Sequence, residues 1–271
     1  MSKPVSARSE PRPFLKWAGG KRQLLADIRK HVPPEFGAYH EPFLGGGAVF
    51  FELEPAKAFL SDSNERLVRC YRGIKHNVDE VIERLKKYRR SRPFFLKLRK
   101  QDIDRATDAE VAAWFIFLNK TGYNGLYRVN SRNEFNVPFG DNRTLICDEK
   151  NLRACQRALA SAEIRHEDFA NVLDRAKRGD LVYFDPPYVP LSATSYFTSY
   201  TAKGFTNDDQ LRLRGLALRL KARGVKVIIS NSSAAADLYK DDGFSLNKVF
   251  AARQVNSKAD RRGKIAELLI S

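Results

Sequence analysis

LVYFDPPY, residues 181–188, is the stretch of this 271-residue chain that most clearly indicates a fold. Its first four residues, Leu181–Phe184, are apolar, and a short apolar run is typical of a strand buried on both faces of a parallel sheet. In such sheets, ligands bind beyond the carboxyl ends of the strands, which is where Asp185 and its successors fall. Each proline disfavours helix in the residue before it, so Asp185 and Pro186 are expected to be extended and rigidly placed. The alternative is that two prolines simply end a strand at a tight turn.

The tetrapeptide Asp185-Pro186-Pro187-Tyr188 offers a side-chain carboxylate and a backbone carbonyl next to each other. Two neighbouring acceptors suit an exocyclic NH2 group, which has two hydrogens to donate. The N6 amine of adenine is a poor nucleophile because its lone pair is delocalised into the ring. Accepting both hydrogens returns electron density to the nitrogen and turns its lone pair toward a methyl donor. Tyr188 offers a flat face for the base, and a base in a duplex has to be flipped out to reach such a site.

A glycine-rich motif, Glu41-Pro42-Phe43-Leu44-Gly45-Gly46-Gly47, precedes the apolar segment Ala48–Leu53. Glycines allow a backbone to approach a ligand closely. Asp62 comes at the end of the next predicted strand, where its carboxylate can accept from ribose hydroxyls. Strand, glycine turn, helix, strand and acid is the order of a nucleoside-binding βαβ unit. Glycine loops also bind dinucleotides or merely turn, and Asp62 is alternatively a structural residue at a strand end.

A third motif, Phe14-Leu15-Lys16-Trp17-Ala18-Gly19-Gly20-Lys21, contains an aromatic side chain beside a glycine turn. The face of Trp17 would attract a sulfonium cation or stack on an adenine ring. Taken without its neighbours, Trp17 is expected to be a core residue.

Strands and helices alternate on both sides of residues 181–188. Apolar spacing predicts a helix at Leu24–Val32, and Thr206 followed by Asp209 predicts the start of a helix that Gly224 ends. The predicted strands are Tyr39–Phe43, Lys57–Ser61, Leu181–Phe184, Val225–Ile229 and an antiparallel edge pair, Phe244–Phe250 with Ile265–Ile270. Alternation of this kind predicts an α/β domain built on a parallel sheet.

From about Asn64 to Asn142 the pattern changes to a basic segment of helical period. This segment ends in Tyr127–Pro138, where alternating residues flank a Ser/Asn-rich turn, which predicts a β-hairpin or an ordered loop. We therefore expect an α/β domain interrupted by a mainly helical insertion. The expected division is a disordered lead-in at 1–12, an α/β domain at 13–63 and 143–271, and the insertion at 64–142.

The chain is strongly basic, with 48 Lys+Arg against 32 Asp+Glu and a formal net charge of +16. An anionic partner is the simplest reason for such a field. The basic residues are clustered, and the two clusters are Arg84, Lys86, Lys87, Arg89, Arg90, Arg92, Lys97, Arg99 and Lys100, and then Arg253, Lys258, Arg261, Arg262 and Lys264. Basic runs interleaved with aromatic residues suit phosphates, although a charge run is often only a solvated face.

The cysteines and histidines do not suggest a metal site. The three cysteines, Cys70, Cys147 and Cys155, have no metal-ligand spacing and form no even disulfide set. Free cysteines are typical of a reducing compartment, so a cytoplasmic protein is expected. The sequence has no run of about 18 apolar residues and no hydrophobic signal core near residue 1, so neither a membrane span nor a secretory leader is expected.

Several motifs together resemble the Dam-type DNA adenine-N6 methyltransferases. The resemblance is carried by Phe14–Lys21, Glu41–Gly47, Asn119–Leu126, Asn130–Gly140 and Asp185–Tyr188, in that order, and it extends from Pro13 to Ile270. It implies a Rossmann-like methyltransferase sheet with an inserted, mainly helical target-recognition domain that carries the hairpin. It also implies S-adenosylmethionine as cofactor and methyl transfer to a flipped-out adenine in double-stranded DNA, within the sequence GATC.

The resemblance implies roles for individual residues. Asp185, Pro186 and Tyr188 match the catalytic pocket. The residues implied in binding S-adenosylmethionine are Trp17, Lys21, Phe43, Gly45, Asp62 and Asp185, with Asp168 and Phe169 in the pocket for its adenine. Lys16 matches a contact to the first guanine of the site. The residues implied in entering and reading the DNA are Tyr123, Asn124, Leu126, Arg128, Asn130, Arg132, Asn136 and Pro138.

Three other readings stay open at this point. A nicotinamide-dependent oxidoreductase would share the glycine loop and Asp62, but it would not explain Asp185 to Tyr188 or the net charge. A DNA-binding protein without catalysis would explain the charge and the hairpin, but it leaves the paired acceptors without a role. Cytosine N4 is the other exocyclic amine that this pocket would suit.

Overall fold

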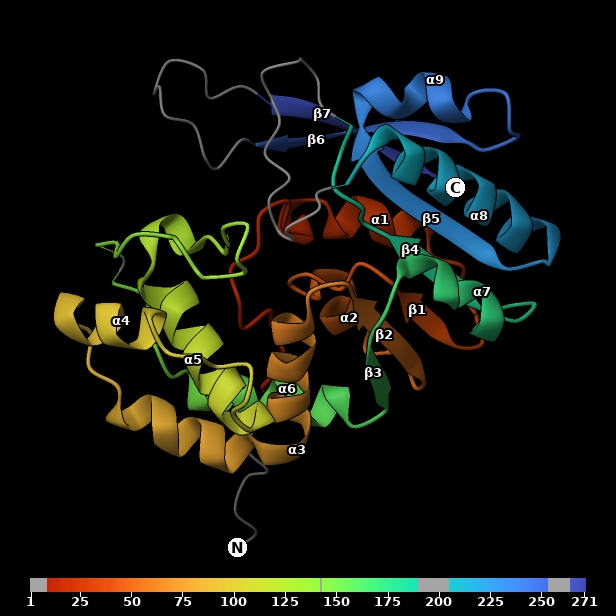
Figure 1. Cartoon of the computed structure of the whole chain (residues 1–271). Coiled ribbons are helices and arrows are strands. Elements are labelled where there is room, and N and C mark those ends of the chain that lie inside the picture. Colours follow the sequence, from red (N-terminus) through yellow and green to blue (C-terminus); the bar gives the residue numbers. More distant parts are fainter. Residues whose placement is uncertain (1–8, 142, 190–204, 253–263) are drawn as a thin grey trace, which may run out of the picture. The chain divides into compact units, whose positions relative to one another are not determined.

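The structure is a computed structural model that describes residues 9–141, 143–189, 205–252 and 264–271 (Figure 1). The strands are β1 Tyr39–Glu41, β2 Ala58–Asp62, β3 Ala162–His166, β4 Leu181–Phe184, β5 Lys226–Ser232, β6 Leu246–Ala252 and β7 Lys264–Ile270. The α-helices are α1 Leu25–His31, α2 Ala48–Leu53, α3 Glu65–Lys87, α4 Arg92–Arg99, α5 Asp108–Thr121, α6 Glu149–Leu159, α7 Val172–Arg175, α8 Asn207–Ala222 and α9 Ala236–Tyr239. Short 3-10 turns are η1 Lys21–Gln23, η2 Tyr123–Gly125, η3 Phe169–Asn171 and η4 Ser233–Ala235.

The strands form one mixed sheet in the order β3-β2-β1-β4-β5-β7-β6. β1 pairs in parallel with β2 and β4, and β4 pairs in parallel with β5. β7 runs antiparallel to both of its neighbours, β5 and β6. The chain adds strands in one direction from β1 to β3 and in the other direction from β4, so the strand order reverses between β1 and β4. Doubly wound sheets bind ligands at such a reversal. The predicted Rossmann-like α/β sheet is confirmed.

Two predicted elements appear with the residues that the sequence indicated. β4 spans Leu181–Phe184, and all four of its residues are buried, as expected of a strand covered on both faces. α8 begins after Thr206, whose hydroxyl accepts from the Asp209 N–H while the Asp209 carboxylate accepts from the Thr206 N–H. This capping box satisfies backbone donors that the first helical turn leaves open. Gly224 follows the helix with a left-handed φ of 78°.

The C-terminal strands differ in two respects from the prediction. β5 continues beyond Ile229 through Ser230-Asn231-Ser232, and all three of these polar residues are buried. The predicted antiparallel pair is present as β6 and β7, but β7 lies inside the sheet between β5 and β6. β6 alone is therefore the edge strand on this side.

Contacts between Cα atoms divide the chain into two compact units. We call the described parts of Met1–Ala18, Gly46–Glu54 and Glu65–Ala162 the helical unit, and those of Gly19–Gly45, Pro55–Asn64 and Glu163–Ser271 the sheet unit. In the sheet unit, α7, α8 and α9 bury apolar side chains such as Leu213, Leu216 and Tyr239 against Val182 and Ile229 of the sheet. This core fixes the carboxyl ends of β4 and β5.

The helical unit is organised by close packing of α3 on α5. A Cβ on Gly73 would lie 2.4 Å from the Asp108 carbonyl oxygen and 2.8 Å from the Ala112 Cβ, so glycine is needed for this approach. α6 joins α3 through the ion pair between Arg153 and Asp79, at 2.7 Å. None of the helices in the described ranges combines the length and the apolar character that a membrane span requires.

Candidate active site

Asp185 follows β4 directly, at the reversal of strand order, and it forms an ion pair with Lys21. The Lys21 Nζ lies 2.8 Å from the Asp185 Oδ1, and the lysine side chain is only 3% exposed. Lys21 begins η1 and also donates to the carbonyl of Gly19. Its Nζ lies 4.8 Å from the centre of the Tyr188 ring, within the range of a cation–π contact. The structure thus joins three of the predicted site residues, although they come from segments far apart in the sequence.

The carboxyl of Asp185 has a raised pKa. Burial, with a smaller contribution from the Glu267 carboxylate, raises the pKa of Asp185 to about 6, against the lowering effect of the Lys21 charge. The side chain is still 22% exposed, so it can be reached from solvent. Near pH 7 the carboxylate is therefore mostly ionised, but a small change in surroundings alters its charge.

Glu267 is a functional candidate that the sequence analysis missed. The Tyr188 hydroxyl donates to its carboxylate. Glu267 lies on β7 and pairs in register with Ser232 of β5, which brings it to the end of the sheet where Tyr188 lies. The available signal was an acid within the otherwise apolar run Ile265 to Ile270. The contact spans 79 positions, so no local pattern reveals it.

Three buried polar side chains hold the turn after β4 from behind. The amide of Gln210 on α8 donates to the carbonyl of Pro187, at 2.8 Å. The Asn231 side chain accepts from the Val189 N–H at 3.1 Å, and the Ser232 hydroxyl donates to the Val189 carbonyl at 2.7 Å. Asn231 also donates to Gln210, so the three residues form a connected network. A buried network whose members are all bonded fixes one conformation of the backbone that it holds.

The network does not use the two acceptors predicted for the turn, the Asp185 carboxylate and the Pro186 carbonyl. Its members donate to the carbonyls of Pro187 and Val189, and no hydrogen bond among the described residues uses the carbonyl of Pro186. The Pro186 carbonyl and the Asp185 carboxylate are adjacent in the chain, and Pro186 is buried. This arrangement offers two acceptors at one place, which is the requirement for binding both hydrogens of an amine.

The glycine loop is anchored by Asp62. The two oxygens of this carboxylate accept from the N–H of Gly45 at 3.0 Å and from the N–H of Asn64 at 2.9 Å. Gly45 and Gly47 have left-handed φ values of 46° and 63°, which disfavour other residues. Burial raises the pKa of Asp62. Asp62 therefore has a structural role, and each oxygen retains a second lone pair with which it can accept from a ligand.

Phe43 and Phe169 pack directly against each other, so their rings do not leave a space for a ligand between them. Their rings are stacked with centroids 5.2 Å apart, which is direct contact. The Arg212 guanidinium lies 4.8 Å from the centre of the Phe169 ring and 2.9 Å from the Asp168 carboxylate. Asp168 also caps η3 by accepting from the Ala170 N–H. The structure thus brings together Phe43, Asp168 and Phe169, and it adds Arg212, which the sequence analysis did not single out.

Trp17 lies in the helical unit, inside an aromatic stack. Its ring is stacked on those of Phe115 and Tyr127, with centroids 6.2 Å and 5.8 Å away, and Phe115 and Tyr127 are themselves 4.5 Å apart. Trp17 is half-buried. The core interpretation of Trp17 therefore describes its packing, and its cofactor contact stays a prediction.

Lys16 and the loop after α5 are joined by a buried asparagine. The Asn119 amide accepts from the Lys16 N–H and donates to the carbonyls of Lys16 and Gly125, at 2.7–2.8 Å. Tyr123 is 55% exposed, and Asn124 has a left-handed φ of 54°. Since Asn119 is 1% exposed, it holds Lys16 and the loop containing Tyr123, Asn124 and Leu126 as one assembly.

The predicted hairpin is reduced to a single antiparallel bridge between Val129 and Phe135. Both bridge residues are buried, whereas Arg128, Arg132 and Pro138 are exposed. A strand conformation is absent here because turn hydrogen bonds replace the ladder beyond the bridge. The segment is thus an ordered loop that presents its basic side chains to solvent.

Two asparagines of this loop have defined partners. The Asn130 amide accepts from the N–H groups of Arg132 and Glu134 and donates to the Glu134 carboxylate. It shapes the turn, so binding a base edge would require exchange of these bonds. The Asn136 amide accepts from the Nε of Arg128 at 2.8 Å. This bond leaves the two terminal nitrogens of the Arg128 guanidinium for another partner.

The first basic cluster is only partly available to a ligand. Lys86 forms an ion pair with Glu149 at 2.5 Å, and Arg84 forms one with Glu80 at 2.9 Å. These two residues have protein partners within the helical unit, and the phosphate contacts of the cluster stay a prediction. The second predicted cluster lies outside the described residues, apart from the backbone of Lys264.

A hollow of about 450 Å³ lies beside the end of the loop Tyr127–Pro138. It is lined by Arg92, Leu96, Arg99, Pro138, Phe139 and Asp141. Arg99 also donates to the Val137 carbonyl at 3.4 Å, which ties α4 to the loop. Within the described residues there is no group of three or more His, Cys, Asp or Glu side chains that would hold a metal ion.

Comparison with known proteins gives one consistent family. A family model described as D12 class N6 adenine-specific DNA methyltransferase matches residues 17–255. The Type II methyltransferase M1.LlaDCHI of Lactococcus lactis subsp. cremoris is 45% identical over 96% of this chain and 95% of its own length. The Type II methyltransferase M.MjaIII of Methanocaldococcus jannaschii is 43% identical over 96% of this chain and 99% of its own length. The DNA adenine methylase of Escherichia coli (strain K12) is 35% identical over 95% of this chain and 94% of its own length.

Proposed function

This chain belongs to the D12 class of N6 adenine-specific DNA methyltransferases, and from that premise we propose which residues perform the reaction and which DNA sequence they select. The methyl donor is S-adenosylmethionine, the acceptor is an adenine flipped out of the duplex, and the recognised sequence is GATC. The observation that carries the proposal is the pair of acceptors, the Asp185 carboxylate and the Pro186 carbonyl, on a turn held by buried polar groups.

The residues of the sheet unit fit S-adenosylmethionine chemically. The stacked rings of Phe43 and Phe169 offer a flat apolar face for adenine, and Asp62 offers an acceptor beside the glycine loop. Asp185 and Glu267 supply negative charge near a cationic cofactor. When bound, S-adenosylmethionine would supply a methyl group on its sulfonium sulfur, and the rest of the molecule would leave as a neutral thioether.

The turn orients the target amine. The ionised Asp185 and the Pro186 carbonyl each accept one hydrogen of N6, which directs the nitrogen lone pair out of the base plane. Lys21 keeps the Asp185 carboxylate in position through their 2.8 Å contact. Lys21 also covers one face of the Tyr188 ring, and the opposite face stacks on the flipped adenine. Preorganised acceptors of this kind lower the barrier without rearrangement during the reaction.

The helical unit selects the DNA sequence. We assign the contacts to base edges and strands to Lys16, Tyr123, Asn124, Leu126, Arg128, Asn130, Arg132, Asn136 and Pro138. Arg128 and Arg132 are exposed on the ordered loop Tyr127–Pro138, which we call the reading loop, and this exposure supports the assignment. Further support comes from Asn119, which binds both Lys16 and the loop that follows α5. Arginine matches the O6 and N7 of guanine with two donors. The insertion at 64–142 is the proposed target-recognition domain, and the protein is proposed to act in the cytoplasm on chromosomal DNA.

Modified-base sequencing of DNA exposed to the protein tests the substrate, the atom and the sequence together. We expect N6-methyladenine in GATC. Methylation of cytosine N4, or of adenine in another sequence, would contradict the corresponding part of the proposal.

The role of Asp185 is tested by Asp185→Ala in single-turnover methyl transfer. Loss of this acceptor removes an electrostatic interaction with the reacting group, which is worth about 2.7–4 kcal/mol and corresponds to a rate at least about a hundredfold lower. Duplex binding is expected to persist. Asp237→Ala is the matched control because Asp237 is an exposed acid that pairs only locally, with Lys240. Near-normal transfer by Asp185→Ala would show that the assignment is wrong.

A further inference from the structure

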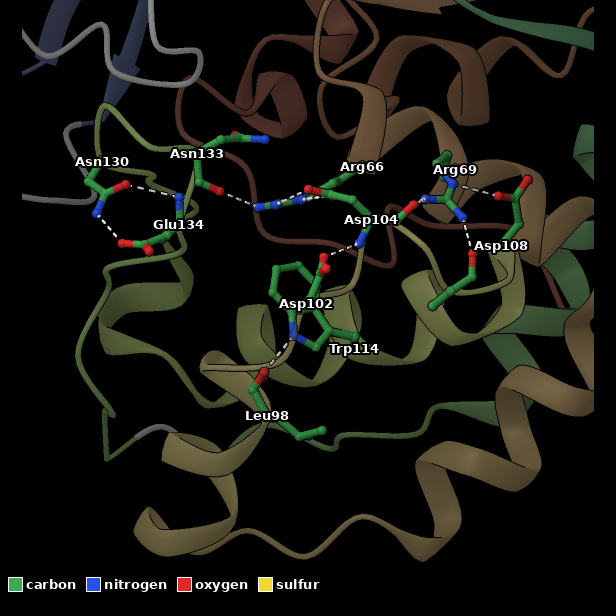
Figure 2. A network of polar contacts seen from close by, with 11 residues as sticks. Arg66, Arg69, Leu98, Asp102, Asp104, Asp108, Trp114, Asn130, Asn133 and Glu134 are labelled. Carbon is green, nitrogen blue, oxygen red and sulfur yellow. Dashed lines mark hydrogen bonds and ion pairs between the residues drawn. The ribbon is translucent and has the colours of Figure 1, made fainter.

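Arg66 lies at the first turn of α3 and is almost completely enclosed within the helical unit. Its side chain is 11% exposed, and its guanidinium carbon lies 5.6 Å from the centre of the Trp114 ring on α5. Arg66 belongs neither to the family motifs nor to the two basic clusters. Figure 2 shows its guanidinium between the segment before α5 and the turn of the reading loop.

On one side, Arg66 forms a two-point ion pair with Asp104. The Nε lies 2.6 Å from Oδ1 and the Nη2 lies 2.7 Å from Oδ2 of the carboxylate. A pair with two parallel hydrogen bonds fixes the plane of the guanidinium as well as its position. Asp104 itself accepts a further contact on its backbone carbonyl, from Arg69 at 2.8 Å, so its segment is also held.

On the other side, Arg66 reaches the reading loop. Its Nη1 donates to the carbonyl of Asn133 at 2.6 Å. Asn133 has a left-handed φ of 60°, and its N–H donates to the carbonyl of Asn130. A residue other than glycine at positive φ is held there by its surroundings. The bond from Arg66 is therefore placed on the residue that determines the path of the turn (Figure 2).

The bonding leaves Arg66 poorly suited to contact DNA directly. Three of its nitrogens have protein partners, and little of its surface is exposed. Its charge is matched by that of Asp104, whose pKa the Arg66 guanidinium lowers. These contacts indicate that Arg66 acts through the loop that it holds.

We propose that Arg66 and Asp104 are a positioning pair that holds the turn Asn130–Glu134 in its DNA-reading conformation and thereby sets sequence discrimination. The inference rests on the proposed role of this loop in reading DNA. A loop that is ordered before it meets the duplex avoids the entropy of ordering it on binding. A loop that is released from Arg66 presents Arg128 and Arg132 in many conformations, and it therefore separates correct from incorrect bases less well.

The test compares Arg66→Lys with Arg84→Lys. Lysine keeps the charge but loses the fork that contacts Asp104 and Asn133 together. Arg84 is the matched control because it lies on the same helix and pairs with Glu80 at 2.9 Å and Glu110 at 3.1 Å, which both lie outside the reading loop. Initial methylation rates are measured on the duplex that the wild-type protein prefers and on duplexes with one base pair changed. Thermal unfolding is measured for each variant.

We expect Arg66→Lys to reduce the ratio of preferred to altered rates by about three- to tenfold, which is the effect of losing one ordinary hydrogen bond. Arg84→Lys is expected to leave this ratio unchanged, even where it lowers the melting temperature. Asp104→Asn, which removes the charge of the partner, should reduce the ratio as Arg66→Lys does. The double variant should be no worse than either single one, because the two residues act as one pair.

An unchanged ratio in both Arg66→Lys and Asp104→Asn would overturn the inference and leave Arg66 with a role in stability alone. Should Arg66→Lys fail to fold, Asp104→Asn decides the question. The proposed reading role fails separately: it is wrong if Arg128→Ala leaves the ratio unchanged. If the ratio of preferred to altered rates falls in Arg128→Ala but not in the Arg66 and Asp104 variants, only the proposal of the positioning pair is contradicted.

Discussion

Lys21 is a buried cation at the turn after β4, where the carboxylates of Asp185 and Glu267 also lie. It pairs with Asp185 and lies over Tyr188, while Tyr188 donates to Glu267. Glu267 therefore acts on Asp185 in two ways, through its charge and through the position of Tyr188. The protonation state of Asp185 depends on both neighbours.

This arrangement predicts how the rate depends on pH. The pKa of Asp185 is raised to about 6, so the carboxylate gains a proton as the pH falls through about 6. A protonated Asp185 loses its ion pair with Lys21 and donates where it has to accept. We expect kcat/KM to be level above pH 7 and to fall about tenfold per pH unit below about 6.

Glu267→Gln is expected to move the acidic limb of this profile to lower pH. Its negative charge raises the pKa of Asp185, so its removal lowers that pKa. Glutamine still accepts from the Tyr188 hydroxyl, which preserves the position of the ring. Glu35→Gln removes an equal charge from an exposed position and should leave the limb in place. A limb that stays fixed, or moves to higher pH, in Glu267→Gln would contradict the charge coupling.

The reading loop shows how short-range interactions compete with strand formation. The sequence Tyr127–Pro138 alternates as a hairpin does, but Asn130 satisfies backbone donors with its own amide and ends the ladder after one bridge. Asparagine favours turns for this reason. Arg128 remains exposed, and its partner Asn136 is half-buried.

Arg128→Ala is expected to cost about 1–3 kcal/mol of discrimination at the preferred site, because a guanine contact with two donors has that value. Rates on duplexes altered at one guanine–cytosine pair should fall less than the rate on GATC. A contact to phosphate would instead lower all rates in parallel. Initial rates on GATC and on single-substitution duplexes distinguish the two roles, and parallel losses would make Arg128 a backbone anchor.

Sequence patterns predicted those elements whose signals are local. The apolar run Leu181–Phe184 and the cap Thr206–Asp209 mark β4 and α8 at the correct residues. Ser230-Asn231-Ser232 was not predicted as strand because Ser and Asn are typical of turns, and only the folded structure shows the partners that allow them to be buried in β5. Glu267 and Arg66 were missed for a related reason. Their roles depend on contacts with Tyr188, Asp104 and Asn133, which the chain brings close only by folding.

Over the full chain, a net charge of +16 favours association with DNA, but the structure distinguishes free cations from paired ones. Lys86 is neutralised by Glu149, whereas Arg92 and Arg99 line a hollow next to Pro138 of the reading loop. Net charge therefore overstates the number of cations available to phosphates. Contacts to phosphates control the salt dependence of binding.

Replacing Arg92 and Arg99 by alanine should weaken binding to every duplex and reduce the slope of log affinity against log salt by about 0.9 per lost phosphate contact. Lys86→Ala should leave the slope nearly unchanged because Lys86 already has a protein partner. Fluorescence anisotropy across a salt series measures both slopes. Equal slopes in all three proteins would place the two arginines away from the phosphates.

The insertion of β7 between β5 and β6 has a consequence for the order in which the sheet assembles during synthesis. β6 is translated before β7, but its partner in the sheet is β7, and β7 in turn pairs with β5. The outer edge of β5 therefore stays open until residues 264–270 have left the ribosome. A nascent chain exposes an unpaired strand edge during this interval, which is the condition under which chains associate wrongly. Tyr188 also lacks its partner Glu267 until β7 has been synthesised, so the contacts of the turn after β4 are completed late.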